Sequence, residues 1–341
     1  MTSPVDTLET VEKLPAPANF VHLRVHSEFS MIDGIVRVKD LIKNAASHHM
    51  PAVALTDQSN MYALVKFYKA ALGAGIKPII GADIWLEYEE ERDAPFRVTL
   101  LAQNKVGYRH ITEIISQAYS HNQFDDKAIV RKEWLLDKAE GLIVLSGFRD
   151  GDIGQQIIKG NIEIAEGLLK DYIAHFGDRF YLELQRTGRE NEELVLNASL
   201  MLAEKCSVPV VATNDIRFNT LDDFEAHETR VCIGESYALA DKRRLKRYSE
   251  QQYFRSAEEM IELFKDIPSA IEHTLEIAKR CSVEVELGTY YLPDFPIPDG
   301  LTEAEYFRQI SYEGLDERLE KILKPEQPDY EERKKEYYER L

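Results

Sequence analysis

The sequence predicts an α/β fold in which a parallel sheet is either doubly wound or closed into a barrel. Short apolar runs rich in β-branched residues alternate with longer amphipathic segments, which is the pattern of repeated strand–helix units. The expected strands are apolar along almost their whole length, as is typical of strands covered on both faces. There are about seven of them, and this number favours a barrel over an open sheet.

We place the boundaries of the elements where the spacing of apolar residues changes from that of a strand to that of a helix, or back. The expected strands are Phe20–Val25, Ala52–Thr56, Pro78–Leu86, Arg97–Ala102, Leu142–Ser146, Phe180–Leu184 and Val208–Thr213. The clearest helices between them are Val38–His48, Ala63–Leu72, Ile162–His175 and Glu192–Lys205. After Phe218 the alternation stops. Ser256–Glu259 has the form of a capping box, and the helical stretch that it opens extends to Cys281 with a break near Pro268.

The pattern divides the chain into three parts. Residues 1–18 are polar, acidic and proline-containing, which predicts a flexible leader, and residues 19–288 hold the predicted barrel domain. Residues 289–341 begin with a proline-rich connector and continue as two strongly charged helical segments, Thr302–Leu323 and Tyr330–Leu341. The last segment reaches Leu341 without a cap or a helix breaker. We interpret residues 289–341 as a connector and the truncated start of a following domain.

Composition limits the possible classes of function. The 341-residue chain is 44% hydrophobic and 30% charged, which is ordinary for a globular protein, and no stretch resembles a transmembrane helix. Three cysteines without CxxC spacing predict reduced thiols and a cytoplasmic location. The net charge of −18 predicts weak binding to DNA. The one cationic run, Lys242–Arg247, is either a solvated loop or a contact for DNA or an acidic partner.

Polar side chains at the ends of the expected strands form the candidate site. His26 and Asp33 follow the first strand, Asp57 follows the second, the third carries Asp83, and Asp215 follows the last. In a barrel, the carboxyl ends of the strands surround one cleft. Imidazole and carboxylate ligands are what a multi-metal phosphoesterase site requires. The alternative is that His26 is a core histidine and that the aspartates cap turns.

These segments resemble the polymerase-and-histidinol-phosphatase (PHP) family, in the version found at the amino terminus of the bacterial DNA polymerase III alpha subunit. The resemblance implies a distorted (β/α)7 barrel followed by a helical segment that leads into the polymerase palm. The motifs that carry it occur in order at His22–Gly34, Ala54–Met61, Pro78–Asp83 and Ala212–Phe218, and the junction is similar at Leu275–Cys281 and Tyr290–Pro296.

The chain departs from the metal-binding members of this family at the ligand positions. The resemblance implies a metal cleft whose retained residues are His26, Asp33, Asp57, Asp83 and Asp215, with Asp83 in place of a longer glutamate. The substituted positions hold Arg24, Gln58, Arg97, Phe148 and Arg217. Arginine offers no lone pair and stays protonated, so it cannot ligate a cation. We therefore predict no bound metal and no catalytic residue in this cleft. Instead, we expect at least two of the three arginines to contact the aspartates.

The resemblance also implies a function. The parent protein would be a DNA-directed DNA polymerase, a nucleotidyltransferase that uses Mg²⁺ held by residues beyond Leu341, while this chain needs no cofactor. The proofreading exonuclease (epsilon) subunit would dock here, and other replicase subunits and DNA would bind downstream parts. The preferred hypothesis is thus a structural and docking module. The alternatives are an active metal-dependent phosphoesterase (a pyrophosphatase or 3′–5′ exonuclease) and a free-standing histidinol-phosphate-type phosphatase, which the junction disfavours.

Overall fold

The computed structural model describes residues 20–87 and 94–341, so the expected leader, residues 1–18, lies outside the described residues. The described chain divides into two units, and the boundary between them in the sequence falls between Val285 and Glu286. Every strand of the described chain belongs to the first unit, and the second unit contains two helices. Each unit is considered by itself below.

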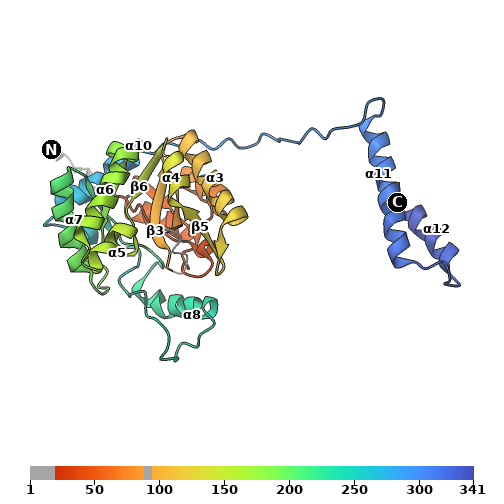
Figure 1. The fold of residues 1–341 in the computed structure, drawn as a ribbon. Helices are drawn as coiled ribbons and strands as arrows, with labels where there is room; N and C mark the ends of the chain where they lie inside the picture. Colours follow the sequence, from red (N-terminus) through yellow and green to blue (C-terminus); the bar gives the residue numbers. More distant parts are fainter. Residues whose placement is uncertain (1–19, 88–93) are drawn as a thin grey trace, which may run out of the picture. The chain divides into compact units, whose positions relative to one another are not determined.

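The first unit is a barrel whose strands form one mixed sheet (Figure 1). The neighbours β2, β3, β6, β7 and β8 follow one another around it, and β1 pairs with β2 in parallel. A small ribbon, β4 with β5, attaches to the last residues of β2. The strand bounds are β1 (Ala52–Leu55), β2 (Lys77–Glu87), β3 (Phe96–Ala102), β4 (Gln123–Phe124), β5 (Lys127–Arg131), β6 (Leu142–Leu145), β7 (Phe180–Leu184) and β8 (Val210–Ala212).

Residues 20–26 close the ring. On one side, amides of β1 and of the residue that follows it donate hydrogen bonds to the carbonyls of His22 and Val25, at 2.8 and 2.9 Å. On the other side, the His26 amide donates to the carbonyl of Ile216, just beyond β8, at 2.9 Å. The ring is therefore the segment 20–26, β1, β2, β3, β6, β7 and β8. This arrangement confirms the distorted (β/α)7 barrel, with isolated bridges in place of a regular first strand.

The expectation of a parallel sheet was wrong for β3, which is antiparallel to both of its neighbours, β2 and β6. The reason is the length of the connection. Only residues 88–95 separate β2 from β3, whereas a parallel connection needs a crossover of a dozen or more residues. The chain must therefore reverse, and this reversal distorts the barrel.

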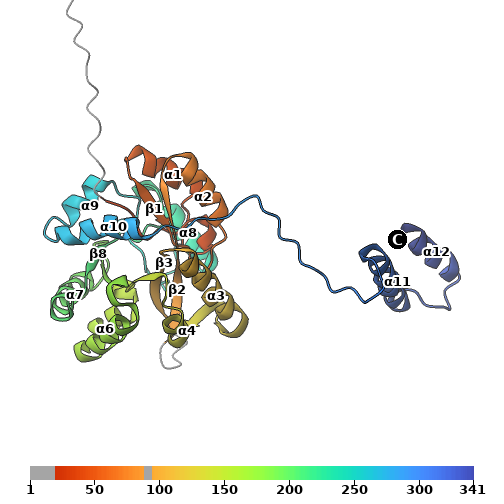
Figure 2. The same cartoon turned by 90° about the horizontal axis from the view of Figure 1, so that it is seen from above.

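Helices surround the barrel, as Figure 2 shows. Their bounds are α1 (Val38–Ser47), α2 (Leu64–Gly73), α3 (Lys105–His121), α4 (Lys132–Asp137), α5 (Asp152–Ile158), α6 (Ile162–Phe176), α7 (Glu192–Cys206), α8 (Phe224–Gly234), α9 (Ala257–Leu263) and α10 (Pro268–Arg280). In α3 the Asn104 side chain accepts hydrogen bonds from two amides of the first turn, at 2.9 and 3.1 Å. Ile111, Ile114, Ile115 and Ala118 then form a buried stripe at helical spacing.

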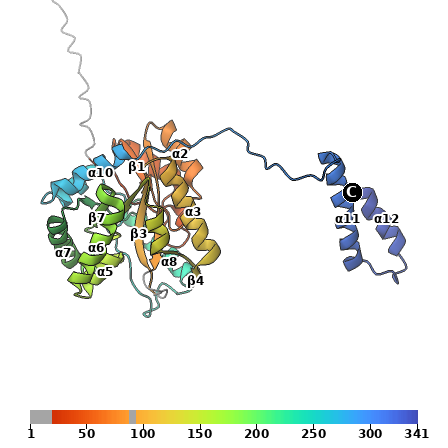
Figure 3. The ribbon, with the colours of Figure 1, turned by 45° about the horizontal axis from the view of Figure 1, so that its top comes forward.

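The region after β8 contains the helices that the sequence predicted. Ser256 and Glu259 form the expected capping box at the start of α9. α10 begins at Pro268, a position where the missing amide hydrogen costs nothing. α8 and the loop that follows it lie at one end of the barrel in Figure 3. This loop contains the cationic run Lys242–Arg247.

The second unit contains α11 (Glu303–Ile322) and α12 (Tyr330–Arg340). A capping box formed by Thr302 and Glu305 starts α11, and the rings of Tyr312 and Tyr338 stack across the helix pair with centroids 6.0 Å apart. Both helices occupy the segments expected from the sequence; that they lead into a polymerase palm stays a prediction. Among the described residues, no helix is both long and apolar enough to cross a membrane.

Candidate functional site

The candidate site is a group of charged side chains inside the barrel, which we call the arginine–carboxylate cluster. Its members are Arg24, His26, Asp33, Asp83, Arg97, Glu183, Asp215 and Arg217. They come from the closing segment 20–26, the turn after it, three strands and the residues after β8. Their side chains are 0–11% exposed, so each charge has left water and needs a partner.

Arg24 occupies the centre of the cluster. Its Nε donates to Asp83 Oδ2 at 2.8 Å, and it also lies 3.2 Å from Asp215 Oδ1. Its Nη1 donates to both carboxylate oxygens of Glu183 at 3.3 Å. Burial works against the charge of Arg24, but the carboxylates outweigh burial and raise its pKa well above the usual range. One guanidinium thus joins β2, β7 and the residues after β8.

Arg217 and Arg97 bind the remaining carboxylates. Arg217 Nη1 donates to Asp33 Oδ2 at 2.7 Å, and its Nη2 donates to Asp215 Oδ1 at 2.6 Å. Arg97 Nη2 donates to the same oxygen of Asp33 at 2.8 Å. All three arginines therefore contact aspartates, which confirms the expectation that at least two would. Their planar groups supply the directed donors that a carboxylate needs.

His26 lies between two of these carboxylates. Its Nδ1 is 3.0 Å from Asp33 Oδ1, and its Nε2 is 2.8 Å from Asp83 Oδ2. Burial and the nearby Arg217 act to lower the pKa of His26, but Asp33 and Asp83 outweigh them and the pKa is raised. A protonated His26 can donate from both ring nitrogens, one to each carboxylate.

The cluster also changes the acidity of its aspartates. Burial alone would raise the pKa of Asp83, but Arg24 and His26 lower it to about 2. Burial also acts to raise the pKa of Asp33 and Asp215, but nearby positive charges, of which Arg217 has the largest effect, outweigh it and lower the pKa of both. The carboxylates are therefore held in their ionised form by fixed positive charge.

Three residues of the predicted cleft have other surroundings. Asp57 accepts hydrogen bonds from the amide and hydroxyl of Ser27, at 2.6 and 2.8 Å, and from Ser30 at 2.7 Å, so it holds the turn after the closing segment. Serine donors nearby in sequence thus satisfy Asp57, in place of the arginines that bind the other aspartates. Gln58 donates to the backbone carbonyl of Asp83 at 3.2 Å. Phe148 is 2% exposed and packs in the core.

Sequence reasoning missed several residues that complete the site. Glu183 is buried in the middle of β7, and a charge inside so apolar a strand was the signal that could have found it. Tyr248, in the loop after α8, donates to Asp33 Oδ2 at 3.1 Å. Arg189 pairs with Asp150 at 2.9 Å beside the cluster. Tyr248 and Arg189 lie in connecting segments without a periodic pattern, so the sequence offered no signal for them.

One subset of the cluster has the spacing of a metal site. His26, Asp83 and Asp215 each offer a ligand atom, and these atoms lie within 4.8 Å of one another. Each of the three is at the same time in contact with an arginine: Arg24 contacts both aspartates, and Arg217 contacts Asp215 and His26. An ion placed between these three ligand atoms would therefore lie next to guanidinium groups.

The fold and the site together define a distorted (β/α)7 barrel whose buried acids are paired with arginines. Residues 22–187 match the PHP domain family. More particularly, the chain is similar to the amino-terminal region of the DNA polymerase III alpha subunit of many bacteria, as the sequence motifs indicated.

The relatives that show this similarity are full-length polymerase subunits. The chain is 54% identical over 323 residues to DNA polymerase III subunit alpha of Pseudomonas aeruginosa, covering 95% of this chain and 28% of that protein. It is 49% identical over 322 residues to the subunit of Escherichia coli K12, covering 94% and 28%. The chain thus spans little more than a quarter of the length of these relatives. Among solved structures, an amidohydrolase from Chromobacterium violaceum overlaps with a TM-score of 0.40 at 14% identity, over 62% of this chain and 96% of that chain.

We predict that Arg24→Ala destabilises the barrel by about 3–5 kcal/mol, because it leaves buried carboxylates without their counter-charge. Urea denaturation followed by circular dichroism measures the change. Arg109→Ala serves as the control, since Arg109 is 70% exposed and its removal should leave stability nearly unchanged. Equal stability of Arg24→Ala and wild type would contradict the prediction.

The lowered pKa values also predict acid sensitivity. A carboxyl group with a lowered folded-state pKa stabilises the fold above its unfolded pKa, and this contribution is lost as the pH falls through the folded value. The free energy of unfolding should therefore drop as the pH falls from about 4 towards about 2, the pKa of Asp83. His26 acts in the opposite direction, because its raised pKa makes its contribution largest at low pH and lost as the pH rises.

Urea denaturation at a series of pH values tests this acid sensitivity. Asp83→Asn should flatten the acid limb of the profile. Asp57→Asn should not, since burial raises the pKa of Asp57. A wild-type profile that stays level between about pH 4 and pH 2 would refute the prediction, whether or not the variants fold.

Proposed function

We propose that this chain is the PHP domain of a replicative DNA polymerase III alpha subunit, where it is a structural and partner-docking module without metal-dependent hydrolysis. One observation carries the proposal: all three arginines of the cluster contact the acids that would otherwise hold metal ions. Side chains of the chain itself thus supply the positive charge that metal ions would otherwise bring to these acids.

The residues present do not fit a metal cluster. A divalent cation between His26, Asp83 and Asp215 would lie beside the guanidinium groups of Arg24 and Arg217, and like charges in a poorly solvated interior repel strongly. Arginine cannot relieve this repulsion by becoming neutral, because its guanidinium group does not lose its proton. The raised pKa of His26 also opposes ligation, since a protonated imidazole has no free lone pair.

The second candidate function is a metal-dependent PHP phosphoesterase, acting as a pyrophosphatase or a 3′–5′ exonuclease. The spacing of His26, Asp83 and Asp215 favours it, because three such ligands could hold one ion. This function would require Arg24 to leave three carboxylates that it contacts now. The cost of stripping those partners makes the docking role the better account.

The proposal extends to the whole protein through its similarity to polymerase subunits. The parent protein would be a cytoplasmic DNA-directed DNA polymerase that uses Mg²⁺ in downstream parts, which would also contact DNA and other replicase subunits. The partner of this domain would be the proofreading exonuclease (epsilon) subunit. A barrel that has kept its fold but lost its metal-ligating residues offers a rigid surface. A rigid surface loses little conformational entropy when it binds a partner.

We expect the purified chain to show no phosphatase, pyrophosphatase or exonuclease activity with Mn²⁺, Mg²⁺ or Zn²⁺, and elemental analysis after dialysis to find less than stoichiometric metal. The reason is the guanidinium charge at the ligand positions. Hydrolysis stimulated by manganese would contradict this, provided that Asp215→Asn abolishes it. The exposed Asp222→Asn is the matched control and must retain the hydrolysis. Hydrolysis that persists in both variants would reveal a contaminating nuclease.

We further expect the chain to form a complex with its cognate proofreading exonuclease in gel filtration. Duplex DNA should bind more weakly than about 10 µM near physiological salt, since a net charge of −18 repels phosphates. Fluorescence anisotropy with a labelled duplex measures the second affinity. The docking role would be refuted if the two proteins eluted separately at concentrations well above those used for the DNA measurement.

A further inference from the structure

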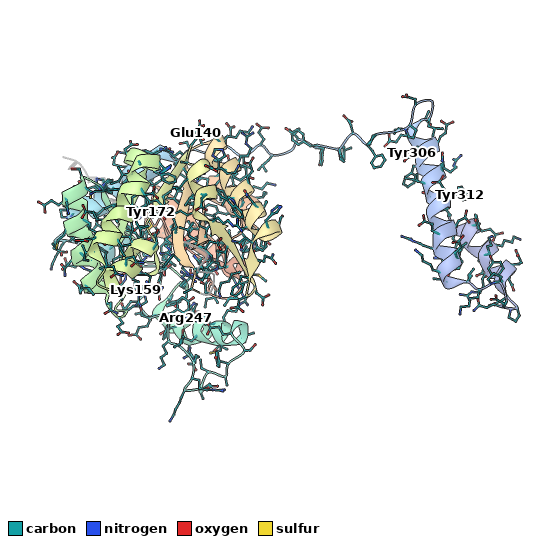
Figure 4. All side chains as sticks on the ribbon, in the orientation of Figure 1. Glu140, Lys159, Tyr172, Arg247, Tyr306 and Tyr312 are labelled. Atoms are coloured by element: carbon teal, nitrogen blue, oxygen red, sulfur yellow. The ribbon has the colours of Figure 1, made fainter. Side chains whose placement is uncertain are left out.

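A wide cleft lies beside the arginine–carboxylate cluster. Its volume is about 780 Å³, and it is lined by neighbouring ends of β2 and β3, Lys127 of β5, the region from Arg149 to Lys159, residues 188–190 and the loop after α8. Figure 4 labels Lys159 and Arg247 on the same side of the barrel, and both line this cleft. Arg97 belongs to both the cluster and the cleft, and Tyr248, which lines the cleft, donates to Asp33 of the cluster, so the two are adjacent.

The cleft is cationic in an acidic chain. Among its described lining residues, seven are lysine or arginine and two, Asp150 and Glu190, are acidic. The chain as a whole carries a net charge of −18. Cations gathered on one concave surface raise the local concentration of anionic ligands. The acidic stretch 88–93 follows β2 in sequence and is not part of this count.

The cations have two different roles. Arg97 and Arg189 are held inward by Asp33, Asp150 and Gln185, at 2.8, 2.9 and 2.6 Å, so they serve the barrel. Lys159 and Lys246 are exposed, and Arg247 is 57% exposed, with its Nη1 3.1 Å from Glu235 Oε1. The charges that a ligand can reach are therefore spread along the rim. Such a spread matches an extended anion better than a single phosphate, which needs donors that converge on one point.

Two aromatic rings of the cleft are already in contact with neighbouring side chains. The Arg97 guanidinium covers the Trp85 ring at 4.5 Å, and the Tyr248 ring is in contact with His227 at 4.8 Å. Single-stranded nucleic acids need free aromatic faces on which bases stack. The largest exposed apolar side chain of the cleft is Leu245, which is 65% exposed next to the basic residues of its loop. Aliphatic side chains of a peptide can pack against it.

We propose that this cleft is the docking site for an acidic peptide segment that also carries aliphatic side chains, contributed by the partner protein. The inference rests on the proposed docking function and assigns it a surface. Carboxylates of the segment would lie along Lys159, Lys246 and Arg247, while its aliphatic side chains contact Leu245. Binding at rim charges predicts fast association and strong dependence on salt.

The test measures the affinity of the cognate exonuclease for wild type and for charge-reversed variants. Lys246→Glu with Arg247→Glu alters the loop after α8, and Lys159→Glu alters the region from Arg149 to Lys159. Lys242→Glu with Arg243→Glu is the matched control, because it makes the same charge change on the same exposed loop outside the cleft. We expect each cleft variant to weaken binding about ten-fold or more, and the control to change it about two-fold at most.

The chemistry of the ligand is tested by competition and with DNA. Among overlapping synthetic peptides that span the exonuclease, the strongest competitor should be acidic and contain aliphatic residues. A neutral or basic strongest competitor overturns the proposal, as does equal binding of wild type and both cleft variants, which would leave the docking function intact. Tight binding of oligo(dT) that only the cleft variants lose would assign the cleft to nucleic acid instead. If wild type fails to bind the exonuclease at all, the docking function itself falls.

Discussion

The charges inside the barrel must balance, and this requirement governs how the rest of the structure is built. With His26 protonated, the cluster contains four positive groups and four carboxylates: Arg24, Arg97, Arg217 and His26 against Asp33, Asp83, Asp215 and Glu183. Removing such groups from water costs several kcal/mol for each ion, and only close partners offset that cost. The backbone of the ring must therefore hold every member within contact distance of an opposite charge.

Asp33 illustrates how widely this requirement reaches. Its carboxylate is contacted by His26 from the closing segment, Arg97 from β3, Arg217 from beyond β8 and Tyr248 from the loop after α8. A metal ion joins distant parts of a chain in the same way, by gathering ligands from several strands. Here directed hydrogen bonds from guanidinium groups do this. The Tyr248 hydroxyl, which donates to the same carboxylate, attaches the loop that lines the cationic cleft.

The sequence predicts the ring well because each strand is a short buried run, and burial is what an apolar pattern records. All seven expected segments are members of the ring. The direction of β3 could not be read from its composition, since an apolar run looks the same in either orientation. The positions of Asp33, Asp83 and Asp215 followed from the rule that strand ends meet, whereas those of Arg24, Arg97 and Arg217 followed from the family resemblance. The serines that hold Asp57 and the tyrosine that reaches Asp33 could not be predicted, because those contacts depend on how loops fold in three dimensions.

The closing segment at residues 20–26 has a consequence for how the protein is made. Arg24 leaves the ribosome before any of its partners, and its contacts with Asp83, Glu183 and Asp215 span most of the barrel sequence. Arg217 and His26, which also touch, are 191 residues apart. A nascent chain thus carries an arginine that cannot be buried until the end of β8 has been synthesised. Contacts of such long sequence separation slow folding, so residues 20–26 are among the last parts of the barrel to reach their native place.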